Sequence, residues 1–554
     1  MDRRSFLRLG AVGAGVSVLR LGPLAPARAG SGPFQHGVAS GDPLADRVII
    51  WTRVTVDAPD PVPVRWIVAR DPDLRDVVAS GEAVTGAESD HTVNVDATGL
   101  EPATTYWYRF ELPVGSASPV GRTRTAPAGR VERVRFAAVS CSSFAAGFFN
   151  PYARLAERDD LDAVVHVGDY FYEGGGADVR PVEPPRETVT LADYRARFAW
   201  YRRDADLQAV HARHPFIAVW DDHESANNSW VDGAGNHQPH TEGEWATRRL
   251  AAVQAYREWM PIRWPDPADP VRIWRHLPFG DLVDLFMVDT RLWGRAQPET
   301  PTGTFEIGSN DPNRTMLGAG QLDWLQAGLA SSADRGVAWR VLGNQTMISP
   351  HRNDPTQPPL PYLPPEAVEV LGIRQGGGNE GADNWGAYWR ERDQLLGFLR
   401  DRAIIDNVVL TGDIHSAWAC DVTEDAYNPA SYDRLTGRGS VAAEFVCTSV
   451  TSHNFEESAA DQAPLLNLLL ETLNPNVIHH DLAGHGYTLV ELTPAAARAE
   501  YWETGTARRR SAEHTLAASL VSHRGTDHVV RAGVPALPRP DRLLGGLVPA
   551  GPLF

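Results

Sequence analysis

One strand-like stretch of this chain ends in two residue types that bind metal ions. VVLTGDIHSAW (408–418) runs from apolar residues into Asp413 and His415. Burying a carboxylate is costly unless it is paired with a cation or binds a metal. An apolar strand that ends in Asp and His therefore predicts a cation at that end.

Three further apolar segments end in the same manner. These segments are RFAAVSCSSF (135–144), LDAVVHVGDYFYE (161–173) and HPFIAVWDDHE (214–224). The metal-binding residue types at or just after their ends are Cys141, Asp169, Tyr172, Asp221, Asp222, His223 and Asn228. Ligands of open α/β sheets bind outside the carboxyl ends of the strands. We therefore expect the four strand ends to bring these side chains to one rim.

The side chains sort into two kinds of ligand. Thiolate, phenolate and imidazole suit a transition metal, and a phenolate beside a carboxylate favours ferric iron. Carboxylates and amide oxygens suit calcium, magnesium or manganese. The mixture predicts one iron-like ion beside one or two hard divalent ions. Two ions about 3.5–4 Å apart can activate water and hold the oxygens of a displacement at phosphorus.

The elements that would position these residues alternate between strand and helix from residue 132 onward. This alternation is typical of an α/β sheet that is covered on both faces. Further apolar strands are expected at 281–291, 338–349 and 441–452, helices at 191–202, 244–260 and 317–332, and a closing hairpin at 487–493 and 497–504.

Residues 35–127 instead alternate apolar and polar residues between turn signals, as half-buried strands do. GLEPATTYWYRF (99–110) resembles the tyrosine-corner segment of fibronectin-III-like sandwiches. The expected organisation is a signal peptide at 1–29, an N-terminal all-β sandwich at 30–128, an α/β catalytic domain at 132–530 and a C-terminal tail at 531–554.

The N-terminus is typical of a twin-arginine export signal. Arg3 and Arg4 precede Ser-Phe-Leu, a weakly apolar stretch follows, and cleavage is expected after Ala29. An ordinary secretory signal or a membrane anchor is the alternative. This export route carries folded proteins, which suits a protein that assembles cofactors first. The protein is therefore expected to be secreted, either extracellular or held in the periplasm or cell wall.

Charge limits the classes of partner. The signal contains five arginines and one aspartate, so its removal changes the formal net charge from −18 to −22. A chain this acidic is not expected to bind nucleic acid tightly. No segment after the signal is long and apolar enough for a stable membrane span.

The chain has three cysteines: Cys141, Cys420 and Cys447. An odd number leaves at least one unpaired in an exported protein. Cys420 and Cys447 lie in apolar runs, where they could form a disulfide or remain two buried thiols. Cys141 is left over, which agrees with a role as a metal ligand.

Together these motifs resemble one enzyme family. GDYFY, DDHE and GDIH lie where metallophosphoesterases carry their metal-binding motifs, and SCSS adds a strand-end cysteine. With the export signal, the chain resembles the alkaline phosphatase D family, which includes the metal-dependent phospholipase D of actinomycetes. The resemblance covers nearly the whole chain. It implies a metallophosphoesterase-type α/β sandwich preceded by a fibronectin-III-like sandwich.

The resemblance also implies metal ligands and cofactors. Asp169 looks like the carboxylate that bridges one ferric ion (Fe³⁺) and calcium, while Tyr172, His415 and Cys141 look like further ligands of the ferric ion. Asp222 and Asp413 stand where related enzymes have an asparagine and a histidine. Oxygen donors at these positions favour calcium, with one or two ions (Ca²⁺) expected.

His223 is the natural group to contact the phosphate or to protonate the leaving alkoxide. The alternative is a histidine that only supports the ligands, and Glu224 is expected to orient it. Asp221 and Asn228 could bind calcium, although Asp221 could equally cap or pack.

Arg248 and Arg249 lie on one predicted helix. One of them is expected to bind phosphate oxygens bidentately, and surface charge is the alternative for each. His166, Asp289, Gln345 and His485 are weaker candidates that are expected to be structural.

The predicted function is a secreted phosphoesterase that hydrolyses phosphomonoesters and phosphodiesters by attack of a metal-activated hydroxide. One alternative is a phospholipase D that releases phospholipid headgroups. Two others are a ferric redox or iron protein and a binding module built on the β-sandwich. The expected partners are a small phosphate ester or phospholipid and the twin-arginine export machinery, with the protein itself a monomer.

Overall fold

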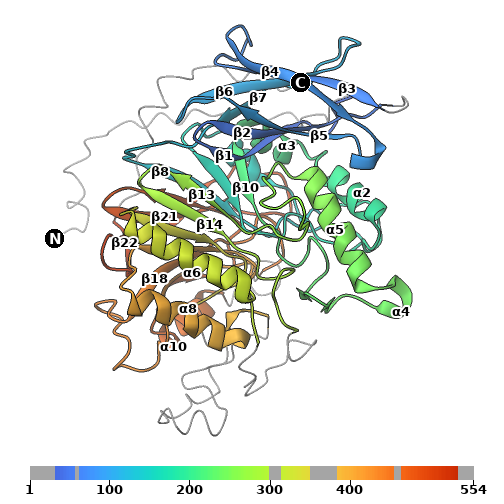
Figure 1. Ribbon diagram of the computed structural model, residues 1–554. Coiled ribbons are helices and arrows are strands. Elements are labelled where there is room, and N and C mark those ends of the chain that lie inside the picture. Colours follow the sequence, from blue (N-terminus) through green and yellow to red (C-terminus); the bar gives the residue numbers. More distant parts are fainter. Residues whose placement is uncertain (1–31, 57–60, 298–313, 350–382, 455–462, 534–554) are drawn as a thin grey trace, which may run out of the picture.

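The predicted apolar segments form the central strands of two large mixed sheets in the computed structural model (Figure 1). The structure describes residues 32–56, 61–297, 314–349, 383–454 and 463–533. The predicted signal segment and the tail after residue 533 lie outside the described residues.

The larger sheet has ten strands in the order β23-β22-β21-β20-β8-β9-β10-β1-β2-β5. Its strands are β1 (Val38–Leu44), β2 (Arg47–Arg53), β5 (Thr92–Thr98), β8 (Val134–Val139), β9 (Ala163–His166), β10 (Pro215–Ala218), β20 (Gly486–Leu492), β21 (Ala496–Glu503), β22 (Thr515–His523) and β23 (Val529–Arg531). β8, β9 and β10 pair in parallel, and every residue in them is buried. Uninterrupted apolar runs form such doubly covered strands. The predicted hairpin is confirmed as β20 and β21.

The second sheet has seven strands in the order β13-β14-β15-β16-β18-β17-β19. They are β13 (Arg275–Phe279), β14 (Val283–Met287), β15 (Trp339–Gly343), β16 (Asn407–Thr411), β17 (Ala417–Thr423), β18 (Ser440–Val446) and β19 (Val477–Asp481). β14, β15, β16 and β18 run parallel to one another. Ser140, just after β8, forms a parallel bridge with Ser449, just after β18. The carboxyl ends of the two parallel cores therefore meet.

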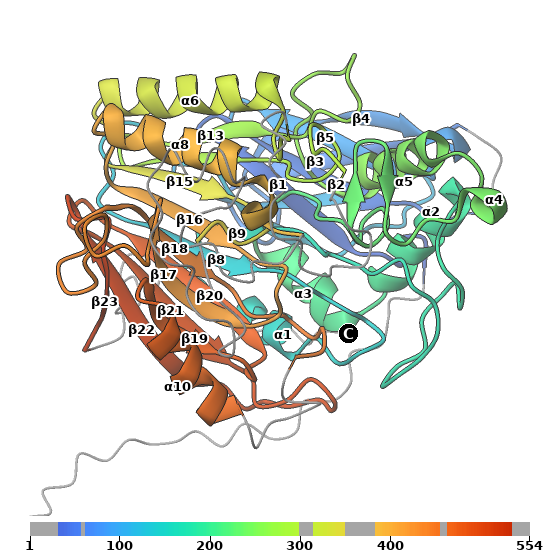
Figure 2. The same ribbon diagram turned by 90° about the horizontal axis from the view of Figure 1, so that it is seen from below.

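Helices cover both sheets (Figure 2). They are α1 (Asn150–Ala156), α2 (Leu191–Tyr201), α3 (Ala205–Arg213), α4 (Pro239–Glu242), α5 (Trp245–Trp259), α6 (Ala319–Asp334), α8 (Trp389–Asp401) and α10 (Ala463–Leu473). α2, α5 and α6 confirm the three predicted helices. Leu325 of α6 and Leu395 of α8 belong to the same buried apolar cluster as Phe286 of the seven-stranded sheet. Among the described helices, none combines the length and the apolar character needed to cross a membrane.

The N-terminal all-β region is confirmed, and three of its strands belong to the ten-stranded sheet of the rest of the chain. A four-stranded sheet of β4 (Val77–Thr85), β3 (Val62–Ala69), β6 (Thr105–Glu111) and β7 (Gly121–Arg124) packs against β1, β2 and β5. The hydroxyl of buried Tyr106 accepts the N–H of Glu101 at 2.8 Å, as a tyrosine corner does. β1 pairs in parallel with β10, with Ser40 opposite Pro215. Strand pairing thus crosses the predicted boundary near residue 130, and that boundary stays a prediction.

The cysteines are all buried free thiols. A Cys420–Cys447 disulfide, one of two alternatives from the sequence, is therefore wrong. Cys420 lies opposite Glu444 in the β17–β18 ladder, whereas the Cys447 thiol donates to the Thr411 carbonyl at 3.2 Å. The strand register sends the two sulfur atoms to different neighbours.

Asp42 joins the N-terminal strands to the rest of the molecule, which generates a prediction. Its fully buried carboxylate accepts from Arg275 Nε and Nη2, each at 2.7 Å. Asp42→Asn keeps the shape and tolerates the backbone φ of 41° but leaves the guanidinium uncompensated. We expect the free energy of unfolding to fall by about 3–5 kcal/mol in urea denaturation followed by tryptophan fluorescence.

The matched control is Asp46→Asn. Asp46 is 58% exposed and pairs with Arg47 at the surface. Exposed pairs contribute little to stability, so this variant should unfold like the wild type. Equal effects of the two substitutions would contradict the anchoring role of Asp42.

Candidate metal centre

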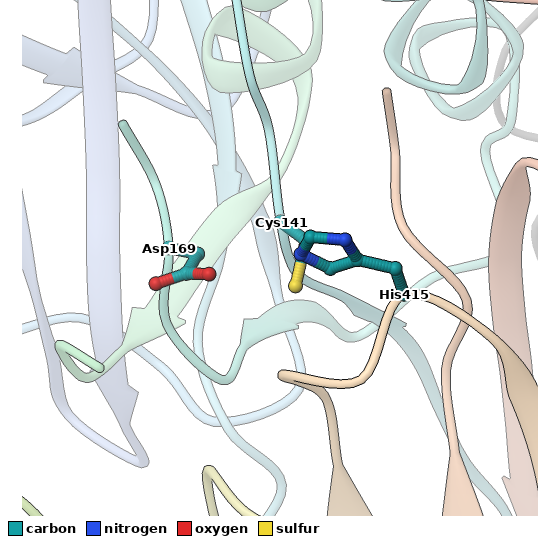
Figure 3. Close-up of side chains that lie close together, drawn as sticks. All are labelled: Cys141, Asp169 and His415. Carbon is teal, nitrogen blue, oxygen red and sulfur yellow. The ribbon is translucent and has the colours of Figure 1, made fainter. Parts of the chain in front are cut away.

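Cys141, Asp169 and His415 converge from the ends of three strands that belong to two different sheets (Figure 3). Cys141 follows β8, Asp169 follows β9, and His415 follows β16 of the other sheet. A sulfur, a carboxylate oxygen and an imidazole nitrogen of these residues all lie within 4.8 Å of one another. One ion could bind all three.

Tyr172 completes this group. Its hydroxyl donates to Asp169 Oδ2 at 2.8 Å and lies 3.0 Å from His415 Nε2. The four residues predicted to bind the iron-like ion are therefore neighbours in space. Their donor set of thiol, phenol, imidazole and carboxylate fits a transition metal.

Protonation states agree with this use. Burial lowers the pKa of His415 to about 4, which leaves the imidazole neutral, the form that binds metals. Its Nδ1–H donates to the His453 carbonyl at 2.8 Å, so Nε2 is the nitrogen that faces Tyr172. Burial raises the pKa of the Cys141 thiol and of the Tyr172 phenol. A neighbouring cation is what would favour their ionised forms.

Two further groups of ligand atoms adjoin the first. One joins Asp169, Asp222 and His223, and the other joins Asp221, Asp222 and Asp413. The backbone N–H of Asn228 donates to Asp222 Oδ2 at 2.6 Å, which places Asn228 beside both groups. Oxygen atoms dominate here, as hard divalent ions prefer.

The buried carboxylates share one pattern of hydrogen bonding that suits cations. Asp169, Asp221 and Asp222 each have one oxygen bonded to a protein donor: the Tyr172 hydroxyl, Arg291 Nε and the Asn228 N–H, respectively. Within the described residues, the second oxygen of each has no hydrogen-bond partner. An unpaired buried carboxylate oxygen is unfavourable unless a cation neutralises it. The residues present therefore fit bound metal ions.

The backbone holds several of these residues in the left-handed region. In the described ranges, thirteen non-glycine residues have positive φ, and five of them are predicted site residues. These five are Cys141 (59°), Asp169 (56°), Asn228 (56°), Asp413 (70°) and His415 (59°). The conformation costs roughly 1 kcal/mol or more per residue and concentrates at functional sites.

Comparison with known proteins decides the family. Residues 136–501 match the model of the PhoD-like phosphatase family, and residues 21–127 match the model of its N-terminal domain. The chain belongs to the PhoD-like phosphatase family. Alkaline phosphatase D of Bacillus subtilis (strain 168) is 34% identical over 493 residues, which cover 85% of this chain and 77% of that protein. A solved structure of PhoD matches with a TM-score of 0.77 and 30% identity, covering 93% and 94% of the two chains.

Family membership confirms the resemblance and the fold that the motifs predicted. It also supports a hydrolase that acts on phosphoric esters, and a metal-dependent one. The roles of individual residues in this member of the family stay predictions.

The structure corrects the predicted partner of His223 in this PhoD-like chain. Glu224 does not orient the imidazole, because its carboxylate accepts the backbone N–H groups of Asp169, Tyr170 and Asp221. Glu173 does so instead, with Oε2 at 2.6 Å from His223 Nδ1. The position of Glu173 directly after Tyr172 was the sequence signal that could have identified it as the partner of His223.

Arg291 is the largest omission from the sequence-based site. Its guanidinium is fully buried and lies among Asp221, Asp383 and Asp413. The apolar strand DLVDLFMVDTR ended in a charged residue, which was the available signal. No sequence signal indicated Asp383, because only the fold brings this residue next to Arg291.

Arg248 and Arg249, of which one was predicted to bind phosphate, both face other groups. Buried Arg248 directs its nitrogens to Tyr194, Asn236, Glu187, Glu242 and Ser225, and Arg249 donates to the Val231 carbonyl. The Arg248 guanidinium is thus held by protein acceptors, and the structure does not bring either arginine into the three ligand groups. Contact with a substrate stays a prediction.

The weaker candidates make hydrogen bonds within the protein. They are His166 with Tyr152, Asp289 with the Arg291 N–H, Gln345 with the Val288 carbonyl, and His485 with Ser449. These contacts agree with the structural roles that were expected.

Gly412 allows the two strand ends to approach closely, which generates a prediction. A Cβ on Gly412 would lie 2.4 Å from Ser140 Oγ and 2.6 Å from Ser140 Cβ. Gly412→Ala should therefore displace the Cys141 segment. We expect a lower melting temperature and a lower metal content by elemental analysis.

Gly397→Ala is the matched control. It lies inside α8, where a Cβ would meet only side-chain atoms at 3.4 Å or more. Alanine favours a helix by about 0.5–1 kcal/mol over glycine. This variant should keep its metal and melt no lower than the wild type, and loss of metal from both variants would contradict the assignment.

Proposed function

We propose that this chain is an exported, metal-dependent phosphoesterase that hydrolyses phosphomonoesters and phosphodiesters. The observation that carries the proposal is the sharing of carboxylates between ligand groups. Asp169 belongs to the first and second groups, and Asp222 to the second and third. Shared carboxylates hold ions a few Å apart, as enzymes that transfer phosphoryl groups require.

We assign the ions by donor type. Cys141, Asp169, Tyr172 and His415 would hold one ferric ion. Oxygen ligands would hold one or two calcium ions, with Asp169, Asp222, Asp221, Asn228 and Asp413 as the candidates. When bound, these ions supply Lewis acidity toward the phosphoryl oxygens and activate water.

His223 is proposed as the proton donor to the leaving alkoxide. Its Nδ1 is held by Glu173. The centroid of its ring lies 4.1 Å from the centroid of the Tyr172 ring. Burial lowers its pKa, but the carboxylates of Glu173, Asp222 and Asp169 outweigh burial and raise that pKa well above the usual value. Because Nδ1 is held by Glu173, Nε2 is the nitrogen that remains to serve a leaving group.

Export and assembly complete the proposal. The Arg3-Arg4 signal would direct the folded, metal-loaded chain through the twin-arginine machinery. The mature protein would then act as a monomer outside the cytoplasm. Small phosphate esters or phospholipids would be its substrates.

The first test compares three substrates with calcium and with a calcium chelator. A chromogenic monoester, a chromogenic diester and phosphatidylcholine are incubated with the purified protein, and product release is measured. We expect calcium-dependent release from the monoester and the diester. Removing calcium alone should abolish turnover while the iron content, measured by elemental analysis, stays unchanged.

Other outcomes have definite meanings. Fast choline release with a slow monoester would replace the broad phosphoesterase by a phospholipase D. A coloured iron protein without turnover of any of the three would support the ferric redox alternative.

A second test examines His223 through the leaving group. His223→Gln should lower kcat about 100-fold for an alkyl phosphate, whose alkoxide needs a proton. The loss should be small for a nitrophenyl phosphate, whose phenolate leaves without one. Glu173→Ala should give the same pattern more weakly, and exposed His240→Gln serves as the control. Equal losses for both leaving groups would assign His223 to phosphate binding or ligand support.

A further inference from the structure

The Arg291 guanidinium lies inside the carboxylate-rich side of the candidate metal centre. Nε donates to Asp221 Oδ1, and Nη2 donates to Asp413 Oδ1 at 3.0 Å. Nη2 also lies 3.8 Å from Asp222 Oδ1. The side chain has no exposed surface. All three partners belong to the ligand group that was assigned to calcium, and Asp222 also belongs to a second group.

A second pair of contacts, made by Asp383, also holds the Arg291 guanidinium in place. Both oxygens of Asp383 accept from Arg291 Nη1, each at 2.8 Å. Asp383 Oδ1 also accepts from Arg295 Nη2 at 2.5 Å, and Arg295 Nε donates to the Tyr388 hydroxyl at 3.0 Å. These hydrogen bonds through Asp383 and Arg295 hold the charge of Arg291 in a fixed position.

Arg291 shares the carboxylates with a potential ion. It bonds Oδ1 of Asp221, while Oδ2 of the same residue has no hydrogen-bond partner among the described residues. The Oδ1 atom of Asp222 likewise has no hydrogen-bond partner among the described residues. The arginine thus neutralises the cluster in part, and oxygens remain for a divalent cation.

We propose that Arg291 is a positioning residue, a permanent counter-cation that holds the calcium-side carboxylates together when no divalent ion is bound. The inference rests on the proposed function to the extent that these carboxylates bind calcium. Without a fixed positive charge, buried carboxylates this close would repel one another and spread apart. With it, calcium can leave and return without loss of the fold. Calcium is then an exchangeable activator of the enzyme, and the concentration outside the cell sets the active fraction.

The test measures stability, not turnover. The melting temperature of the purified full chain is recorded with excess calcium and with a calcium chelator that leaves iron in place. The wild type should melt at nearly the same temperature in both conditions. Arg291→Met should melt much lower in chelator, and added calcium should restore most of the loss, because the ion replaces the missing charge. We expect its calcium-induced shift to be at least twice that of the wild type.

Arg135→Met is the matched control. Arg135 is also a buried guanidinium, paired with Asp160 and Glu491, but it lies near the start of β8, whereas the ligands follow the strand ends. Its loss should destabilise the protein equally with and without calcium. The calcium-induced shift should therefore match the wild type.

Two results would overturn the inference. One is a wild type that loses as much stability on calcium removal as Arg291→Met does. The other is an Arg291→Met variant whose calcium-induced shift equals that of the control. If Arg291→Met does not fold, Arg291→Gln replaces it, because it removes the charge but keeps hydrogen-bond donors. A calcium-induced shift larger than that of the wild type supports the inference, and a wild-type shift with wild-type calcium affinity by titration calorimetry overturns it.

Failure of the proposed function would look different. A chain that cleaves no phosphate ester could still show the larger calcium-induced shift of Arg291→Met. Conversely, an active phosphoesterase could show no such shift. The two measurements therefore separate the function of the centre from the role of Arg291.

Discussion

Mutual repulsion among carboxylates that share one buried rim is the constraint on which the other features of this structure depend. Asp169, Asp221, Asp222 and Asp413 come from three strand ends and converge within a few Å. Such a cluster persists only if positive charge lies among its members. Arg291 supplies part of that charge from the protein, and the unpaired carboxylate oxygens indicate where cations would supply the rest. The same arrangement explains why a hydrolase of this family depends on metal.

The scaffold serves this convergence by packing two sheets against one shared apolar core, with the carboxyl ends of their parallel strands side by side. The Ser140–Ser449 bridge brings the carboxyl end of β8 to that of β18, and Gly412 lets β16 approach Ser140. The left-handed turns at Cys141, Asp169 and His415 then aim the side chains inward. Their backbone cost is offset by the surrounding pairing, since each turn directly follows a buried strand.

Much of this could be predicted from the sequence, because the information was local. Apolar runs that end in Cys141, Asp169 or His415 identify both the strand and the ligand. Arg291, Asp383 and Glu173 escaped prediction, because each matters only through a partner brought near by the fold. Likewise, Glu224 follows His223 in the sequence, but its carboxylate faces three backbone N–H groups. Side-chain direction at a turn is decided by tertiary contacts that sequence spacing does not record.

The strand order of the ten-stranded sheet has a consequence for biosynthesis. β8 lies at the centre of this sheet, where its Val134 pairs with Leu492 of β20. Ser40 of β1 pairs with Pro215 of β10, so β1 lacks this neighbour until β10 has been synthesised. A ribosome releases β8 long before β20 exists, because hundreds of residues separate these two strands, whereas β9, the other neighbour of β8, follows it closely. Folding with such distant contacts is slow and leaves strand edges open in the nascent chain. A sheet of this order can close around β8 only after β20, which lies near the end of the chain, has been synthesised.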